Sequence, residues 1–126
     1  MIGIRAIASY IPKDRVDNLD RQKILDFESE FLEKKIGFLT ISRKSLTEET
    51  SDMCCSAFDR LVKDERIDLD SVQVVIVCTQ NPDYSIPHTS AIVHGKLGLS
   101  DHCAAFDISL GCSGYIYGLS AVSYTH

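Results

Sequence analysis

The stretch that decides the fold is DISLGCSGYIYGLS, residues 107–120, in which Cys112 stands between two glycines. An apolar run, residues 104–108, leads into the turn and predicts a buried strand. Residues from Ser113 onward predict a helix, so the chain must turn from strand to helix within residues 109–111. This spacing places Cys112 at or near the first residue of that helix.

A cysteine at this point is suited to nucleophilic chemistry. Unpaired N–H groups and the positive end of the helix dipole stabilise a thiolate within the first turn. The backbone N–H of Cys112 can also donate to a developing oxyanion. Gly111 and Gly114 would permit a strained turn and leave room for a bulky substrate, as in a nucleophile elbow. The same residues also fit a small buried cysteine at a tight turn, so both interpretations stay open.

Two further segments predict strands. Residues 72–78, VQVVIVC, form a continuous β-branched run, which is typical of a central strand covered on both faces by helices. Residues 2–9, IGIRAIAS, alternate between two faces and predict a strand that Pro12 stops. Residues 79–87 contain an Asn-Pro step and predict a loop.

Helices are predicted between and after the strands. Gly37 and Gly98 stand where a glycine commonly ends a helix. Ser45 and Glu48 fit the capping-box pattern that begins one. Apolar residues recur at helical spacing in each segment. The helices are expected over residues 18–35, from the Ser45 capping box to near Glu65, over residues 89–97, and from Ser113 onward.

This order of strands and helices predicts an α/β layered domain with a largely parallel sheet covered by helices. The chain has 126 residues, of which 44% are hydrophobic and 25% charged, and we expect residues 1–126 to form one domain. The chain stops inside the last predicted helix without a stop signal. We therefore expect it to be part of a longer protein.

Charge and hydropathy exclude several classes of partner. The net charge is −5, and no run of Lys or Arg is longer than the pair at positions 34 and 35, which argues against a nucleic-acid or anionic-membrane surface. No stretch approaches the roughly 18 apolar residues of a membrane span. The N-terminus lacks the apolar core of a signal peptide. These features predict a cytoplasmic location and no membrane span.

The cysteines and histidines do not predict a metal site or a disulfide framework. The number of cysteines is odd and no C-x-x-C is present, so we expect free thiols in a reducing compartment. No histidine stands at a spacing that marks it as the partner of a nucleophilic cysteine. The residues concerned are Cys54, Cys55, Cys78, Cys103, Cys112, His88, His94, His102 and His126.

Four motifs together resemble the β-ketoacyl-acyl-carrier-protein synthase III family of the thiolase-like superfamily. AAFDISLGCSGYIYGLS looks like the segment around the active-site cysteine of that family, and IASYIP looks like its opening strand and turn. EETSDM resembles the start of its second helix, and PDYSIPHTSAIVHGKLGL resembles the loop and helix before its third strand. The resemblance implies two similar α/β halves and identifies this chain with the N-terminal, thiolase-like half-domain.

The resemblance also implies an acyltransferase of fatty-acid or related biosynthesis. Cys112 would take an acyl group from acyl-CoA, and the carbanion from decarboxylated malonyl-carrier protein would then attack the thioester. A histidine and an asparagine of the C-terminal half support that second step, so we expect this chain alone to be inactive in condensation. The implied partners are acyl-CoA, the acyl carrier protein and a second subunit of a homodimer, with no cofactor and no metal.

Three positions are implied to bind substrate. Phe31 and Lys35 lie where the family often has a tryptophan and an arginine that grip the nucleotide end of CoA. Ile86 matches the residue that reaches across the dimer interface toward the neighbour's acyl pocket, where a smaller aliphatic group admits a larger acyl chain. Simple loop packing is the alternative interpretation for Ile86.

Two other functions remain open at this point. A hydroxymethylglutaryl-CoA-type synthase would carry the same cysteine turn, and a glutamate acid/base in the remaining half would identify it. A non-catalytic interaction subunit or truncated fragment would bind a partner without turnover.

Overall fold

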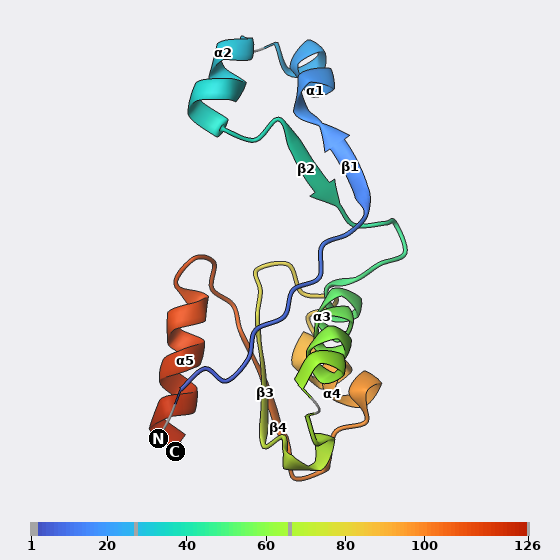
Figure 1. Cartoon of the computed structure of the whole chain (residues 1–126), viewed down its shortest axis with the longest axis vertical. Helices are drawn as coiled ribbons and strands as arrows, with labels where there is room; N and C mark the ends of the chain where they lie inside the picture. Colours follow the sequence, from blue (N-terminus) through green and yellow to red (C-terminus); the bar gives the residue numbers. More distant parts are fainter. Residues whose placement is uncertain (1–2, 27, 66, 126) are drawn as a thin grey trace. The chain divides into compact units, whose positions relative to one another are not determined.

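The computed structural model describes residues 3–26, 28–65 and 67–125. The chain divides into two compact units (Figure 1). We call Met1–Tyr10 together with Glu49–His126 the core unit, and Ile11–Glu48 the inserted unit.

The core unit is built on one parallel pair of strands. Strands β3 (Val74–Cys78) and β4 (Ala104–Ile108) run side by side, with Cys78 opposite Ile108. Helix α4 (Thr89–Leu97) connects them and ends at Gly98, whose φ of 62° is the left-handed conformation that glycine adopts without strain. The predictions for β4, for α4 and for its closing glycine are confirmed.

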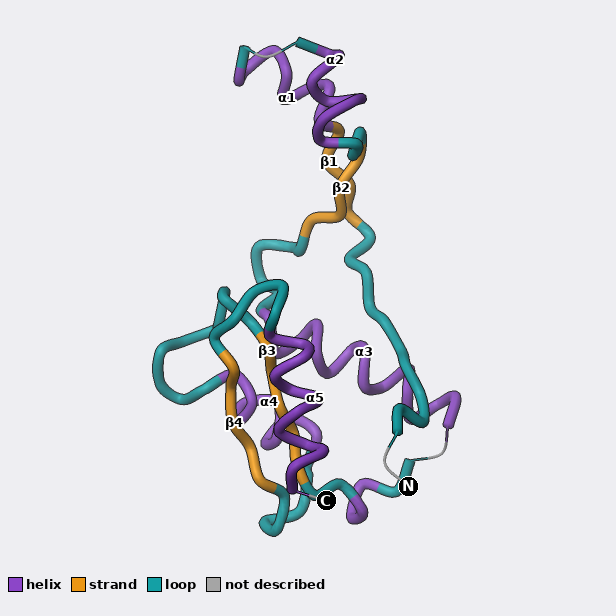
Figure 2. The backbone as a smooth tube through the Cα atoms, turned by 90° about the vertical axis from the view of Figure 1, so that its left-hand side faces the viewer, coloured by secondary structure: helices purple, strands orange, loops and turns teal. Residues whose placement is uncertain are grey.

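Helices cover both faces of this pair. Helix α3 (Thr50–Glu65) packs against α4 on one face, and α5 (Gly114–Thr125) lies against the other face (Figures 1 and 2). A short 3₁₀ turn, η2 (Leu69–Ser71), precedes β3. The α/β class and the parallel pairing predicted from the sequence are therefore confirmed. Among the described residues of this unit, the buried hydrophobic ones are Val77, Val93, Leu99 and Cys103.

Asp107 fastens α4 to β4. Its two carboxylate oxygens accept the backbone N–H groups of Thr89 (2.9 Å) and Ser90 (2.8 Å), the first residues of α4, both of which are fully buried. These N–H groups have no partner within the helix, and a carboxylate at this end also interacts favourably with the helix dipole. One side chain on β4 therefore determines where α4 begins.

The loop between β3 and α4 is tied to α3. Thr50 Oγ1 donates to the carbonyl of Asn81 (2.7 Å), and Asp83 accepts the backbone N–H of Ser51 (3.0 Å). The N–H of Asp83 donates to Thr89 Oγ1 (3.2 Å). Lys96 on α4 adds an ion pair to Asp52 on α3 (2.5 Å) and a hydrogen bond to Ser51. The loop and both helices therefore form one hydrogen-bonded assembly.

The inserted unit contains an antiparallel pair that the sequence analysis did not predict. Strands β1 (Asp14–Asp17) and β2 (Thr40–Arg43) pair with Val16 opposite Ile41. Between them come α1 (Asn18–Leu25), α2 (Ser29–Phe31) and the π-helical turn η1 (Leu32–Ile36). Gly37, at φ 73°, ends η1 as predicted.

The prediction of one helix over residues 18–35 is wrong, because the structure breaks it into separate pieces. Asp26 adopts a left-handed conformation with φ 50°, and its N–H returns to the carbonyl of Gln22, which ends α1. Asp17 caps α1 by accepting the N–H of Leu19 (2.8 Å). Phe27, which contributed to the predicted apolar stripe, lies outside the described residues.

The strand predicted at residues 2–9 is also wrong for the part that the structure describes. Residues 3–10 form no strand, and Ile4 and Ile7 are 57% and 81% exposed. Alternating apolar and polar residues give a strand two different faces. A strand also needs a neighbouring strand to form hydrogen bonds with its backbone N–H and C=O groups. Arg60 instead holds this segment, donating to the carbonyl of Ser9 (2.7 Å) with its guanidinium 5.4 Å from the Tyr10 ring centre.

Two smaller predictions need correction. Within the described residues β3 pairs only with β4, so β3 is not a central strand. The Ser45 and Glu48 pair forms a turn, in which the Ser45 N–H donates to the Glu48 carboxylate (3.4 Å), and the helix begins later, at Thr50. The start of α3 is capped by Asp52, which accepts the Glu49 N–H (2.9 Å).

Strand β4 has one unpaired edge among the described residues. Ala104 donates its N–H to the carbonyl of Gln73 on the β3 side (2.9 Å). Because peptide groups alternate in direction along a strand, those of Ala105 and Asp107 point away from β3. Such an edge is a template for pairing with another chain.

We predict that this edge pairs with a second copy of the chain and that Ala105→Pro weakens the association. Proline removes an N–H that points away from β3, so the β3–β4 ladder should remain intact. Light scattering over a concentration series measures the effect. Phe106→Pro is the control, because its N–H belongs to the β3 side and its loss should destabilise the fold. A wild-type chain that is monomeric at every concentration would contradict the prediction.

We also predict that Asp107→Asn lowers the free energy of unfolding by about 1–3 kcal/mol, because an amide offers one acceptor oxygen where the carboxylate offers two charged ones. Urea denaturation followed by circular dichroism measures the change. Asp101→Asn is the matched control, since Asp101 is exposed and no hydrogen bond of its side chain is recorded in the described part of the chain. Equal stability of the two variants would refute the role of Asp107.

Candidate functional site

Cys112 lies in the turn that joins β4 to α5. The N–H of Gly114 donates to the carbonyl of Gly111 (2.9 Å), which closes the turn around Cys112. The carbonyl of Ser113 accepts the first helical hydrogen bond, from Tyr117 (3.2 Å), so Ser113 is the residue that caps α5. Cys112 therefore comes one residue before the cap, near the helix start as predicted, and it is exposed.

The glycines of this turn serve close packing. A Cβ atom added to Gly114 would lie 3.4 Å from the Cβ of Cys78, and one added to Gly118 would lie 3.4 Å from its Sγ. The Cys78 thiol donates to the carbonyl of Gly114 (3.3 Å). Gly111 does not have a left-handed φ. The prediction that it relieves strain in the turn is therefore wrong. Gly114 and Gly118 allow α5 to approach β3 closely, and this contact positions the helix that follows Cys112.

The other thiols occupy different environments. Cys103 is buried. Burial raises the pKa of the Cys54 thiol, and the neighbouring Cys55 raises it further. Burial likewise raises the pKa of Cys55, against an opposing effect of Lys96. Cys78 is exposed but its thiol is engaged with Gly114. A raised pKa leaves less thiolate at neutral pH, so Cys54 and Cys55 should react more slowly at pH 7 than thiols of ordinary pKa.

Ile86 lies in the loop after β3, and Cys112 lies in the turn after β4. Because the two strands are parallel, both connections begin at the same end of the pair, its carboxyl end. The side chain of Ile86 is 85% exposed, so packing within the described residues does not explain an apolar group here. The structure thus brings Ile86 and Cys112 to one edge of the core unit.

Phe31 and Lys35 belong to the inserted unit. Phe31 ends α2 and is 47% exposed, and Lys35 is exposed on η1, which continues the same helical segment. Their spacing of four residues makes them neighbours on its surface. Lys34 beside them is paired with Glu30 (2.6 Å). Phe31 and Lys35 therefore place an aromatic ring and a cation about one turn apart on the same helical segment.

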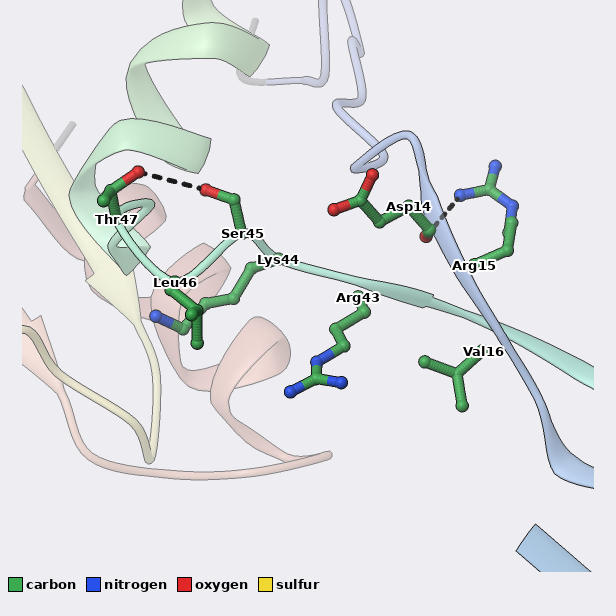
Figure 3. A pocket seen from close by; sticks show the side chains of 8 residues that line it. All are labelled: Asp14, Arg15, Val16, Arg43, Lys44, Ser45, Leu46 and Thr47. Carbon is green, nitrogen blue, oxygen red and sulfur yellow. Dashed lines mark hydrogen bonds between the residues drawn. The ribbon is translucent and has the colours of Figure 1, made fainter. Parts of the chain in front are cut away.

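A hollow of about 570 Å³ lies at the open end of β1 and β2 (Figure 3). Its cations are Arg15, Arg43 and Lys44, beside the carboxylate of Asp14. Figure 3 shows Arg43 extending away from Arg15, whose guanidinium turns back to the backbone carbonyl of Asp14 (3.1 Å). The cations do not converge on one point, so the hollow is not an assembled anion site.

The core unit contains an apolar cavity of about 380 Å³ between α3, α4 and β3. Cys54 and Cys78 contribute to its wall. Within the described residues no group of His, Cys, Asp or Glu side chains is gathered as metal ligands are. No helix of the described residues is both long and apolar enough to cross a membrane.

The sequence analysis missed two residues at this site. Asp107 anchors α4 to the strand that carries Cys112, and its signal was a charged residue inside the otherwise apolar run of β4. Gln80 is the other: a Cβ atom on Gly111 would lie only 2.9 Å from its Oε1. No sequence pattern points to Gln80, because its contact is with a residue of the next loop.

Comparison with known proteins identifies the relatives of this fold. β-Ketoacyl-[acyl-carrier-protein] synthase III of Latilactobacillus sakei is 42% identical over 114 residues, which are 90% of this chain and 34% of the relative. The enzyme of the same name from Caldanaerobacter subterraneus is 36% identical over 94% of this chain and 35% of its own length. The chain is similar to the N-terminal part of β-ketoacyl-acyl-carrier-protein synthase III. It spans about a third of the length of these curated relatives.

Solved structures agree with this similarity. The crystal structure of synthase III from Thermus thermophilus superposes with a TM-score of 0.89 at 32% identity, covering 98% of this chain and 38% of that one. A crystal structure of OleA from Xanthomonas campestris has a TM-score of 0.82 at 22% identity, covering 94% of this chain and 38% of that one. This similarity shows a shared fold. No family model matches the chain. The resemblance to synthase III and the thiolase-like fold predicted from the sequence are confirmed.

We predict that Cys112 is alkylated before the other thiols when the folded chain receives less than one equivalent of iodoacetamide at pH 7. It is exposed, whereas Cys103 is buried and the pKa of Cys54 and of Cys55 is raised. Peptide mass spectrometry locates the label. Raising the pH should increase labelling of Cys54 and Cys55, since their thiolates form only at higher pH. Preferential labelling of Cys78 at pH 7 would contradict the prediction.

Proposed function

We propose that this chain is the nucleophile-bearing part of a synthase III-like acyltransferase and that Cys112 is its acyl acceptor. The observation that carries the proposal is an exposed cysteine one residue before the cap of α5, in a chain similar to synthase III over 90% of its length. The first N–H groups of a helix have no partner within it, and reactive cysteines commonly occur at helix starts.

In the proposed first step the Cys112 thiolate attacks the carbonyl carbon of acyl-CoA. The electron pair of the carbonyl moves to oxygen, where backbone N–H groups of the turn can stabilise it. The bond to the CoA sulfur then breaks, CoA leaves as a thiolate that takes a proton from solvent, and the acyl group remains on Cys112. This step needs only groups that the turn itself carries.

The second step is a decarboxylative condensation with malonyl-carrier protein. Loss of CO₂ leaves its electron pair on the α-carbon, which attacks the Cys112 thioester and releases the thiolate. Charge developing on the malonyl thioester oxygen has to be stabilised, and the synthase III resemblance assigns that task to a histidine and an asparagine outside these residues. We propose that the whole enzyme, with acyl-CoA and the acyl carrier protein as partners, works in fatty-acid or related biosynthesis in the cytoplasm as a homodimer.

We propose Phe31, Lys35 and Ile86 as substrate-binding residues. Phe31 and Lys35 supply an aromatic face and a positive charge, which suit the adenine ring and the phosphates of CoA. Ile86 is an exposed apolar side chain at the edge that carries Cys112, and it suits an acyl chain. The reaction needs no resident cofactor, because both reactants are thioesters.

We predict that the 126-residue chain is acetylated on Cys112 by acetyl-CoA but gives no condensation product. Loss of one oxyanion-stabilising group costs on the order of a hundredfold to a thousandfold in rate, and the loss of two places turnover below detection. Intact-protein mass spectrometry detects the acetyl group, and product analysis after adding malonyl-carrier protein detects condensation.

Cys112→Ala and Cys55→Ala are the matched controls for this experiment. Acetylation should disappear in the first variant and persist in the second. Absence of acetylation in the wild-type chain would refute the proposed role of Cys112. Steady Cys112-dependent condensation by this chain alone would show that its catalytic partners lie within these residues.

A further inference from the structure

Gln80 and Gly111 meet at the carboxyl end of the β3–β4 pair, where Cys112 also lies. Gln80 is the second residue after β3, and Gly111 comes three residues after β4. A Cβ atom added to Gly111 would lie 2.9 Å from Oε1 of Gln80 and 3.4 Å from its Cδ. The carboxamide of Gln80 therefore lies directly against the backbone of the residue before Cys112.

This carboxamide is available to a ligand. Gln80 is exposed, and in the described part of the chain no hydrogen bond is recorded for its side chain. Cys112, one residue beyond Gly111, is exposed as well. A carboxamide offers donors and an acceptor in one plane, so it can both donate to and accept from another amide.

We infer that Gln80 is a specificity-determining residue that hydrogen-bonds an amide of the pantetheine arm of the acyl thioester attacked by Cys112. The inference rests on the proposed function of Cys112. The pantetheine arm is uncharged, carries secondary amides and is joined to the sulfur of the bond that breaks. An uncharged amide beside the nucleophile therefore matches the arm in chemistry, and it selects thioesters that carry one.

The absence of a side chain at Gly111 leaves room for the Gln80 carboxamide. A side chain at position 111 would occupy the place of the Gln80 carboxamide, which is the far end of a flexible side chain and can move away. Gly111→Ala should therefore leave the fold intact while displacing the carboxamide. This variant and Gln80→Ala remove the same contact from its two sides.

The test compares two acetyl donors on the full 126-residue chain. Acetyl-pantetheine carries the arm without the nucleotide, and S-phenyl thioacetate carries no amide. The variants are Gln80→Ala and Gly111→Ala. The matched control is Gln73→Ala, an exposed glutamine directly before β3, at the opposite end of the strand from Gln80. Intact-protein mass spectrometry gives the rate of Cys112 acetylation, and methyl methanethiosulfonate gives the intrinsic reactivity of the thiol.

Gln80→Ala and Gly111→Ala should slow acetylation by acetyl-pantetheine about fivefold to tenfold, the effect of one lost hydrogen bond between neutral groups. Their rates with S-phenyl thioacetate and with methyl methanethiosulfonate should equal those of the wild-type chain. Gln73→Ala should behave as wild type with every reagent.

Three results would overturn the inference. An equal fall with both donors would show that Gln80 acts on the thiol and not on the arm. Unchanged acetylation by acetyl-pantetheine in Gln80→Ala would show that the arm does not contact Gln80. A wild-type chain that neither donor acetylates would contradict the proposed function, and the inference would fall with it.

Discussion

The two hydrogen bonds from the first residues of α4 to Asp107 are the contact on which the core unit depends. They fix where α4 begins relative to β4, and β4 delivers Cys112 four residues after it ends. The Thr89 hydroxyl in turn holds the end of the loop after β3, since it accepts the N–H of Asp83. Asp107, through Thr89, thus links the loop of Ile86 and Gln80 to the strand that leads into Cys112.

The site around Cys112 combines this anchoring with close helix packing. Gly114 and Gly118 bring α5 against Cys78, so the helix that follows Cys112 is positioned by β3 as well as by β4. The thiol itself remains exposed in the turn. A rigid strand pair with an open turn at its carboxyl edge is the arrangement in which α/β proteins commonly bind ligands.

The proposed function and the inference about Gln80 use opposite properties of the same edge. In the proposal, Cys112 is the reactive group, in the turn before α5, and Gln80 is an uncharged carboxamide that binds the substrate without reacting. Under this proposal, the thioester is selected through its arm, and the acyl chain is left to an apolar residue such as Ile86. Phe31 and Lys35 of the inserted unit are the residues proposed to bind the nucleotide.

The sequence by itself determined β4, α4, the closing glycines Gly37 and Gly98, and the turn at Cys112. These features are local: a β-branched or apolar run, a helical period and a glycine at a left-handed position lie within a few residues of what they specify. The motif around Cys112 also carried the resemblance to synthase III, which the comparisons confirm.

Only the tertiary structure decided the remaining features, because each depends on a partner distant in the chain. The alternating residues 3–9 form no strand, because within the described residues no neighbouring strand pairs with their backbone. Strands β1 and β2 do pair, with Val16 opposite Ile41, 25 residues later in the chain. The contact of Gln80 with Gly111 exists because parallel pairing brings two separate loops to one edge. Pairing between distant segments produces no periodic pattern in the sequence, so the residues around Cys112 can be identified only from the fold.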